Sequence, residues 1–219
     1  MDSLIQPLLY FRKKAYNSHL NSSSDALEAG SEREPVKVEN NMIITGIAHS
    51  PSRLREKKEI PSLELAFLAV RALQEYQATR LVTTLAPGWE QALAKAAIEL
   101  EIPYTVAVPF PRPNFFWHPD SEKLYMELLA GADEARKVKD PPVEINWRIA
   151  QANLILALWD YEFQGEVYTL VDQALRMGKK VANLWQDWEA LLSLKKVYGV
   201  VYNLPKRGAQ IYESRKSTL

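Results

Sequence analysis

The chain has 219 residues, of which 47% are hydrophobic and 25% charged, as expected for a globular protein with one sizeable core. Its 27 Lys and Arg balance its 27 Asp and Glu, which disfavours a uniformly basic nucleic-acid binder. The absence of Cys excludes disulfides, thiolate zinc sites and thiol catalysis, and the longest apolar run is too short to span a membrane.

Residues 1–40 differ in composition from the rest of the chain. Four apolar residues could line one face of a short helix: Leu4, Leu8, Phe11 and Ala15. A serine-rich and then acidic stretch to residue 39 is typical of a linker. We interpret 1–40 as an arm that is either mobile or docked on the domain or on a protein partner. Its basic residues follow the apolar stretch, the reverse of a secretory signal, so we expect a cytoplasmic protein without a membrane anchor.

From residue 42 onward, apolar runs alternate with amphipathic stretches. The apolar runs predict strands over 42–45, 81–84, 104–108, 135–138, 154–159 and 181–184. The amphipathic stretches predict helices over 62–77, 90–101, 121–130, 143–152, 167–177 and 187–194. Ser62 is the expected N-cap of the first helix, and Gly131 and Gly178 follow two helix ends. We expect Gly46 and Pro109 to end their strands and 198–202 to add one more strand.

This alternation indicates the fold class. Continuous apolar strands are typical of a sheet that is covered on both faces, and strands alternating with helices favour parallel pairing. We therefore predict a Rossmann-like three-layer α/β/α domain with a mostly parallel sheet over residues 41–194. Residues 1–40 form the N-terminal arm and 195–219 a C-terminal extension.

In such a sheet the ligand lies beyond the carboxyl ends of the strands, near the helix N-termini. The segments to consider are 45–49, 88–90, 109–117 and 160–166. Each has an ordinary alternative: isolated glycines serve tight turns, and His49 on a polar loop is an exposed histidine. An aromatic group either stacks on a base or folds onto the core: Phe110, Phe115, Phe116 and Trp117.

Metal and nucleophilic chemistry have little support in the sequence. The three histidines, His19, His49 and His118, are far apart and have no metal-ligand spacing, so we expect no metal site. A GxSxG nucleophile turn is also absent.

The succession of segments resembles the SLOG superfamily, which is named for DNA-processing protein A (DprA) and the LOG phosphoribohydrolases. The matching segments are Ile44-Thr45-Gly46, 85–90 followed by Ala92, Ala96 and Ala97, 102–111, 117–119, 128–134, 146–153, Leu158-Trp159-Asp160 with Gly165, and Ala174 with 178–181. Together they span residues 42–184 and are most similar to bacterial and phage members of unassigned function.

The resemblance implies a Rossmann-like fold that binds a nucleotide-derived ligand. Carried over to this sequence, the site residues are Thr45, Gly46, Gly88, Trp89, Glu90, Asp160 and Gly165. The chain departs from the family at Leu85, which replaces a glycine, and at Glu90, where Asp is usual. Of the second glycine-rich turn only Gly165 remains, and Glu166 places a negative charge where phosphate would lie.

Three functions follow as hypotheses. The first is non-catalytic binding of a nucleotide-derived small molecule, with no resident cofactor. The second is an enzyme that cleaves N-glycosidic bonds, with Glu90 or Asp160 as the carboxylate that the oxocarbenium-like transition state requires. The third is a degenerate pocket that serves as a protein-interaction module. Binding of single-stranded DNA has no electrostatic support at zero net charge, and the oligomeric state stays open.

Overall fold

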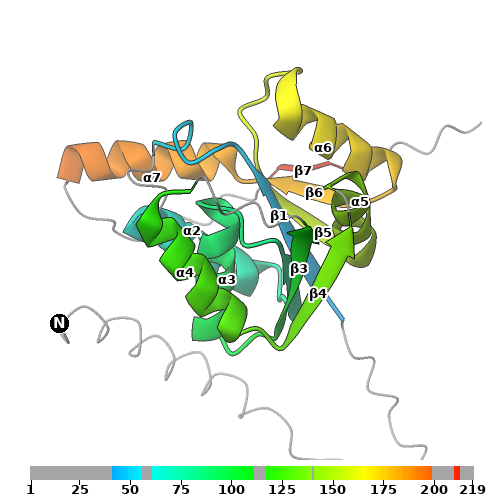
Figure 1. Ribbon diagram of the computed structural model, residues 1–219. Helices are drawn as coiled ribbons and strands as arrows, with labels where there is room; N and C mark the ends of the chain where they lie inside the picture. Colours follow the sequence, from blue (N-terminus) through cyan, green and yellow to red (C-terminus); the bar gives the residue numbers. More distant parts are fainter. Residues whose placement is uncertain (1–40, 56–60, 111–116, 140, 199–209, 213–219) are drawn as a thin grey trace, which may run out of the picture. The chain divides into compact units, whose positions relative to one another are not determined.

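The computed structural model describes residues 41–55, 61–110, 117–139, 141–198 and 210–212 (Figure 1). The expectations for 1–40 therefore lie outside the described residues. The strands are β1 Ile43–Ala48, β2 Arg80–Thr83, β3 Tyr104–Phe110, β4 Glu134–Lys139, β5 Leu154–Leu158, β6 Lys180–Asn183 and β7 Gln210–Tyr212. The helices are α2 Leu63–Glu75, α3 Trp89–Glu99, α4 Pro119–Ala130, α5 Pro141–Gln151, α6 Gly165–Arg176 and α7 Trp185–Tyr198.

The strands form a single sheet in the order β4-β3-β2-β1-β5-β6-β7. All pairs from β1 to β6 are parallel, and β7 pairs antiparallel with β6. One face is covered by α2, α3, α4 and α7, and the other by α5 and α6 (Figure 1). The predicted Rossmann-like α/β/α fold with a mostly parallel sheet is confirmed.

The two faces of the sheet bury separate apolar cores. The larger core, under α2, α3, α4 and α7, contains Trp89, Tyr104 and Trp188. The smaller core, under α5 and α6, contains Ile149, Ile155 and other apolar side chains. Every residue of β5 is buried, which explains its continuous apolar sequence.

Helix termini follow the signals in the sequence. Ser62 is the N-cap of α2, and its hydroxyl accepts a hydrogen bond from the backbone N–H of Leu65 at 3.2 Å. His118 caps α4 through Nδ1, which accepts from the N–H of Asp120, and Pro119 is the first helical residue. Gly131 is the C-cap of the same helix.

Gly46 does not end the first strand, as the sequence suggested, but lies inside β1 and pairs with Leu156 of β5. A Cβ atom at Gly46 would lie 2.7 Å from Cδ1 of Leu93 in α3. The glycine therefore permits close packing of α3 on β1 rather than a turn.

Pro109 likewise lies within β3, where it pairs with Val138 of β4. The register with β2 ends at Val106, so the last part of β3 pairs with β4 alone. A proline without an N–H is tolerated there because one side of the strand has no ladder to complete.

The C-terminal elements also differ from expectation. Helix α7 is longer than the predicted 187–194 and includes Tyr198, which therefore does not begin a strand. Residues 199–202 lie outside the described residues, and the added strand is β7 at 210–212. None of the helices in the described ranges is long and apolar enough to cross a membrane.

Candidate functional site

The strand order creates a switch point between β1 and β5. From β1 the sheet grows through β2, β3 and β4 on one side, whereas β5 and β6 lie on the other. The last paired residues of the two strands are Ala48 and Leu158. The loops that follow them diverge toward opposite faces, which is where open α/β sheets place their ligands.

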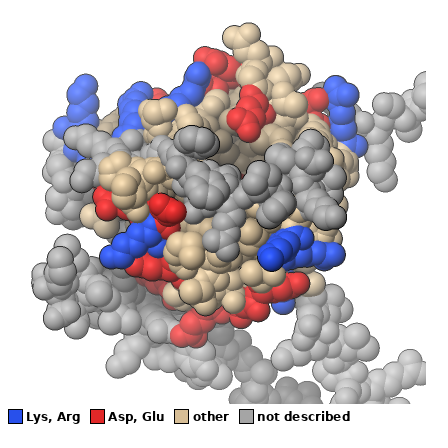
Figure 2. Space-filling model, in the orientation of Figure 1, with Lys and Arg blue, Asp and Glu red and all other residues tan. Residues whose placement is uncertain are grey.

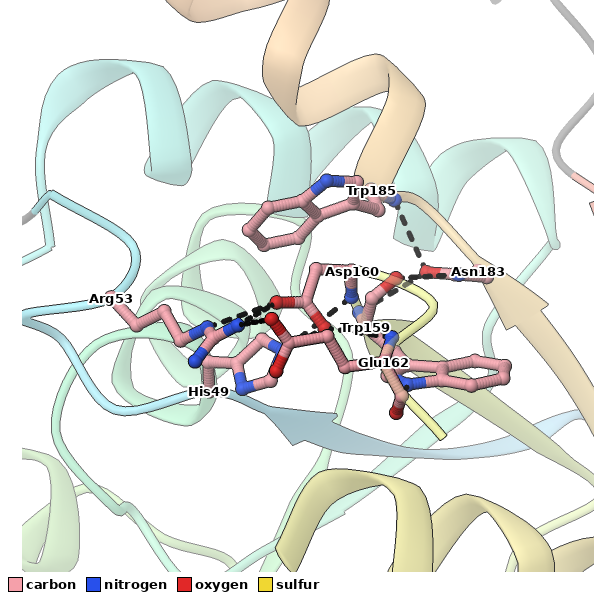
Figure 3. Close-up of polar contacts among 7 residues, drawn as sticks. All are labelled: His49, Arg53, Trp159, Asp160, Glu162, Asn183 and Trp185. Atoms are coloured by element: carbon pink, nitrogen blue, oxygen red, sulfur yellow. Dashed lines mark hydrogen bonds and ion pairs between the residues drawn. The ribbon is translucent and has the colours of Figure 1, made fainter. Parts of the chain in front are cut away.

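Four side chains from these two loops meet in one hydrogen-bonded group, here called the switch-point cluster: His49, Arg53, Asp160 and Glu162 (Figure 3). Nε2 of His49 lies 2.9 Å from Oδ1 of Asp160. Arg53 donates to Oδ2 of Asp160 through Nε at 2.9 Å and also through Nη2. The same Nη2 lies 2.5 Å from Oε1 of Glu162. The cluster thus joins the loop after β1 to the loop after β5.

Asp160 is the least exposed carboxylate of the cluster, with 11% of its side chain accessible. Burial raises its pKa, but hydrogen bonds from Arg53, from the backbone N–H of Glu162 and from His49 outweigh burial and hold the pKa below its ordinary value. Hydrogen bonds with Asp160 and Glu162 raise the pKa of Arg53. Asp160 and Arg53 therefore stay charged at neutral pH.

Asn183, at the end of β6, holds the backbone next to the switch-point cluster through hydrogen bonds. The buried Asn183 donates through Nδ2 to the carbonyl of Trp159 at 2.8 Å. Its Oδ1 accepts from the backbone N–H groups of Trp159 and Trp185, each at 3.2 Å (Figure 3). The Trp185 ring meets the His49 ring edge to face, with centroids 5.7 Å apart. These contacts fix the start of the β5 loop against α7.

Aromatic rings from the loop after β5 and from the first turn of α6 pack together. Trp159, Tyr161, Phe163 and Tyr168 form this aromatic loop cluster, with Phe163 edge to face on Trp159 at 5.5 Å and on Tyr168 at 5.7 Å. Phe163 is nevertheless 74% exposed. Its ring is oriented by its neighbours and remains open to a planar partner.

Glu90 belongs to a separate, buried network. Its Oε2 accepts hydrogen bonds from the Thr83 hydroxyl at 2.9 Å and from the Thr84 N–H and hydroxyl at 2.6 and 2.7 Å. Its Oε1 pairs with Nη1 of Arg148 at 2.7 Å, and the same nitrogen donates to the Gly46 carbonyl at 2.5 Å. Glu90 and Arg148 are only 7% and 4% exposed. The pair joins α3 to α5 across the carboxyl ends of β1 and β2, which favours a structural role for Glu90.

The other predicted site residues lie in different settings. Thr45 is fully buried beside Arg148, and Trp89 is buried with Nε1 donating to the Leu156 carbonyl at 3.0 Å. Gly88 is the N-cap of α3 and Gly165 is the first residue of α6, with φ of 86° and 87°.

The structure thus brings three of the seven predicted residues together and places Asp160 in another group. Thr45, Gly46 and Glu90 gather around Arg148, whereas Asp160 joins the switch-point cluster. A role for any of them in ligand binding stays a prediction. The sequence analysis did not single out Arg53 or Asn183, although one follows β1 and the other ends β6, which could have drawn attention to them. Glu162 lies in the segment 160–166 that the sequence did indicate.

Other expectations concern metals and the aromatic segment. In the described ranges no group of three His, Asp or Glu residues could hold a metal ion. Phe115 and Phe116 lie outside the described residues, and Trp117 packs edge to face on Tyr125 at 5.4 Å, next to the larger core. On the face shown in Figure 2, both basic and acidic side chains of the described residues are present.

No family model matches the chain, and no curated protein matches it in sequence. Among solved structures, it is similar to the molybdenum cofactor carrier protein of Chlamydomonas reinhardtii, with 17% identity over 73% of this chain and 86% of that chain, and a TM-score of 0.43. A second structure of that carrier is 16% identical over 73% of this chain and 85% of the carrier, with a TM-score of 0.41. The molybdenum cofactor binding protein of the phototrophic bacterium Rippkaea orientalis gives 16% identity over 71% and 86%, with a TM-score of 0.43. At these values the likeness supports no conclusion about ligand or activity, and SLOG membership stays a resemblance.

Proposed function

We propose that this protein binds a nucleotide-derived small molecule at the carboxyl ends of β1 and β5. The observation that carries the proposal is the switch-point cluster, in which polar side chains from two diverging loops meet at the edge where α/β sheets hold their ligands. The cluster is partly exposed, since Arg53 is 45% and Glu162 50% accessible.

The groups present suit the parts of a nucleotide. Arg53 donates hydrogen bonds that suit a phosphate, Asp160 orients the Arg53 guanidinium, and the half-exposed Glu162 carboxylate can accept hydrogen bonds from hydroxyl or amino groups. The exposed ring of Phe163 suits stacking of a base. Gly165, at the start of α6 on the same loop, adds backbone N–H groups of the first helical turn.

The contacts of the carboxylates favour binding over cleavage of an N-glycosidic bond. A carboxylate that stabilises an oxocarbenium ion must face the sugar. Glu90 is buried against Thr83, Thr84 and Arg148. Asp160 is occupied by His49 and Arg53. We therefore expect no free base to be released when the protein is incubated with nucleosides and nucleotides.

A thermal-shift panel of nucleosides, nucleotides, cyclic nucleotides, NAD-derived compounds, ADP-ribose and the molybdenum cofactor tests the proposal. We expect one compound class to raise the melting temperature in a saturable way, because a ligand that binds the folded state stabilises it. Asp160→Asn should abolish this rise. Asp172→Asn, on the exposed side of α6, is the matched control and should retain it.

Gly88 is a poor choice for this test. Its φ of 86° strains any L side chain. A substitution there would therefore destabilise the fold with or without a ligand site.

If no compound raises the melting temperature of the wild-type protein, ligand binding is contradicted and the interaction module is favoured. The next experiment would then be the capture of partners through residues 1–40.

A further inference from the structure

Arg53 holds two carboxylates that differ in how firmly they are fixed. Asp160 is largely buried, and its Oδ1 lies 2.9 Å from Nε2 of His49 and accepts a hydrogen bond from the backbone N–H of Glu162 at 3.2 Å. The Glu162 side chain is half exposed, and in the described part of the chain its carboxylate makes one ion pair, with Arg53. Asp160 is therefore a fixed partner that orients the guanidinium, whereas Glu162 is an exchangeable one.

The backbone at Glu162 is anchored even though its side chain is exposed. Its N–H donates to Asp160, and its carbonyl accepts from Nε1 of Trp159 at 2.9 Å. The carboxylate can thus leave Arg53 by side-chain rotation alone, without a change in the loop. Side-chain rotation at an exposed residue takes place within nanoseconds.

The charges decide what can approach Arg53. With Glu162 in place the guanidinium already faces two carboxylates, so a further anion would be repelled. An exposed ion pair of this kind is weak. A phosphate group carries more negative charge than a carboxylate group and accepts strong hydrogen bonds from a guanidinium, so it would compete with the Glu162 carboxylate for Nη2 of Arg53.

We infer that Arg53 is the anion-binding residue of the site, and that the Glu162 carboxylate occupies its place until a phosphate or pyrophosphate group displaces it. This inference rests on the proposed function, since it assigns the anionic part of the nucleotide-derived ligand to Arg53. Glu162 then lowers the affinity for every anionic ligand and weakens binding of ligands with a single charge most.

A matched control is the ion pair of Arg55, which lies on the same loop as Arg53. Arg55 pairs with Glu189 of α7 at 3.6 Å, and Glu189 is 46% exposed, close to the exposure of Glu162. Glu189→Gln makes the same change in charge and size as Glu162→Gln. It leaves the Arg53 contacts intact, so it separates local competition from a general change in net charge.

The test is calorimetric titration of inorganic pyrophosphate into the wild type and the variants at low salt. We expect Glu162→Gln to lower the dissociation constant about two- to fivefold, the range set by an exposed ion pair. Glu189→Gln should leave it within error. Arg53→Gln should abolish binding, and Arg53→Lys should retain part of it because the charge remains without the fork geometry.

Unchanged or weaker pyrophosphate binding in Glu162→Gln would overturn the inference, as would undiminished binding in Arg53→Gln. Melting temperatures without ligand show whether each variant is folded. Absence of pyrophosphate binding in all proteins would also overturn it, while stabilisation by an uncharged nucleoside, lost in Asp160→Asn, would leave the proposed function standing. If the pyrophosphate affinities of the variants follow the expected order but no nucleotide raises the melting temperature, the anion site is supported and nucleotide binding is contradicted.

Discussion

At the scale of single residues, Asp160 shows burial and hydrogen bonding acting in opposite directions on one carboxyl group. Burial disfavours its charged form, yet the donors around it favour that form more strongly, and the net pKa is lowered. Because the folded pKa lies below the unfolded one, Asp160 stabilises the fold above its ordinary pKa near 3.8. This stabilisation is lost as the pH falls through the lowered folded pKa.

Asp160→Asn should therefore lower the free energy of unfolding near neutral pH by about 1–3 kcal/mol, since it removes the charge that Arg53 and His49 bind. The difference from the wild type should shrink as the pH falls below about 4. Urea unfolding of both proteins from neutral to acid pH measures it. A difference that stays constant to the lowest pH would show that Asp160 is not the titrating group.

The Glu90–Arg148 pair provides a second prediction for single residues. Arg148→Met should cost about 3–5 kcal/mol of unfolding free energy, because it leaves a buried carboxylate without its cation. Arg176→Met is the control: Arg176 is 79% exposed and pairs with Asp172, so the cost should stay below about 1 kcal/mol.

Glu90→Gln combined with Arg148→Met should recover part of the loss, since a neutral amide replaces the unpaired carboxylate. Urea unfolding of the two single variants and the double variant measures the coupling. Strict additivity would contradict the ion pair.

At the scale of secondary-structure elements, the contact between β1 and α3 depends on Gly46. A methyl group there would lie 2.7 Å from Leu93 Cδ1 and 3.2 Å from Trp89 Cδ1. Gly46→Ala should therefore cost about 1–3 kcal/mol through overpacking. In a Leu93→Ala background the cost should fall, because the closest atom is gone. Thermal or urea unfolding of the four proteins tests this, and an equal cost in both backgrounds would refute the steric explanation.

At the scale of the whole molecule, stability should decrease from the centre of the sheet toward its edges. β1 and β5 are central and covered on both faces, whereas β4 and β7 are edge strands. Hydrogen exchange should therefore be slowest in β1 and β5 and faster in β4 and β7. Exchange measured by mass spectrometry on peptides from each strand tests this order. Protection in β4 equal to that in β5 would indicate a further partner along the β4 edge.

The sequence could predict most of the elements because local patterns determine them. The apolar run of β5, the N-cap Ser62 and the C-cap Gly131 all carried the correct signals. The errors arose where the structural reason is non-local. The glycine at position 46 is explained by the close packing of α3, which lies far along the chain. Pro109 is tolerated inside β3 because the pairing of β3 with β2 ends at Val106.

The sequence by itself therefore determined the fold class, because hydrophobic periodicity and the alternation of strands with helices follow from nearby residues. It also predicted that a site belongs at the carboxyl ends of the strands. Only the tertiary structure decided which side chains meet there. Residues about a hundred positions apart, such as Arg53 and Asp160, come together through the β1–β5 pairing. The same packing buries Glu90 against Arg148 and thereby separates two carboxylates that the sequence alone had treated as equivalent candidates. The physical reason is that burial and charge pairing depend on contacts between distant segments, which local pattern does not encode.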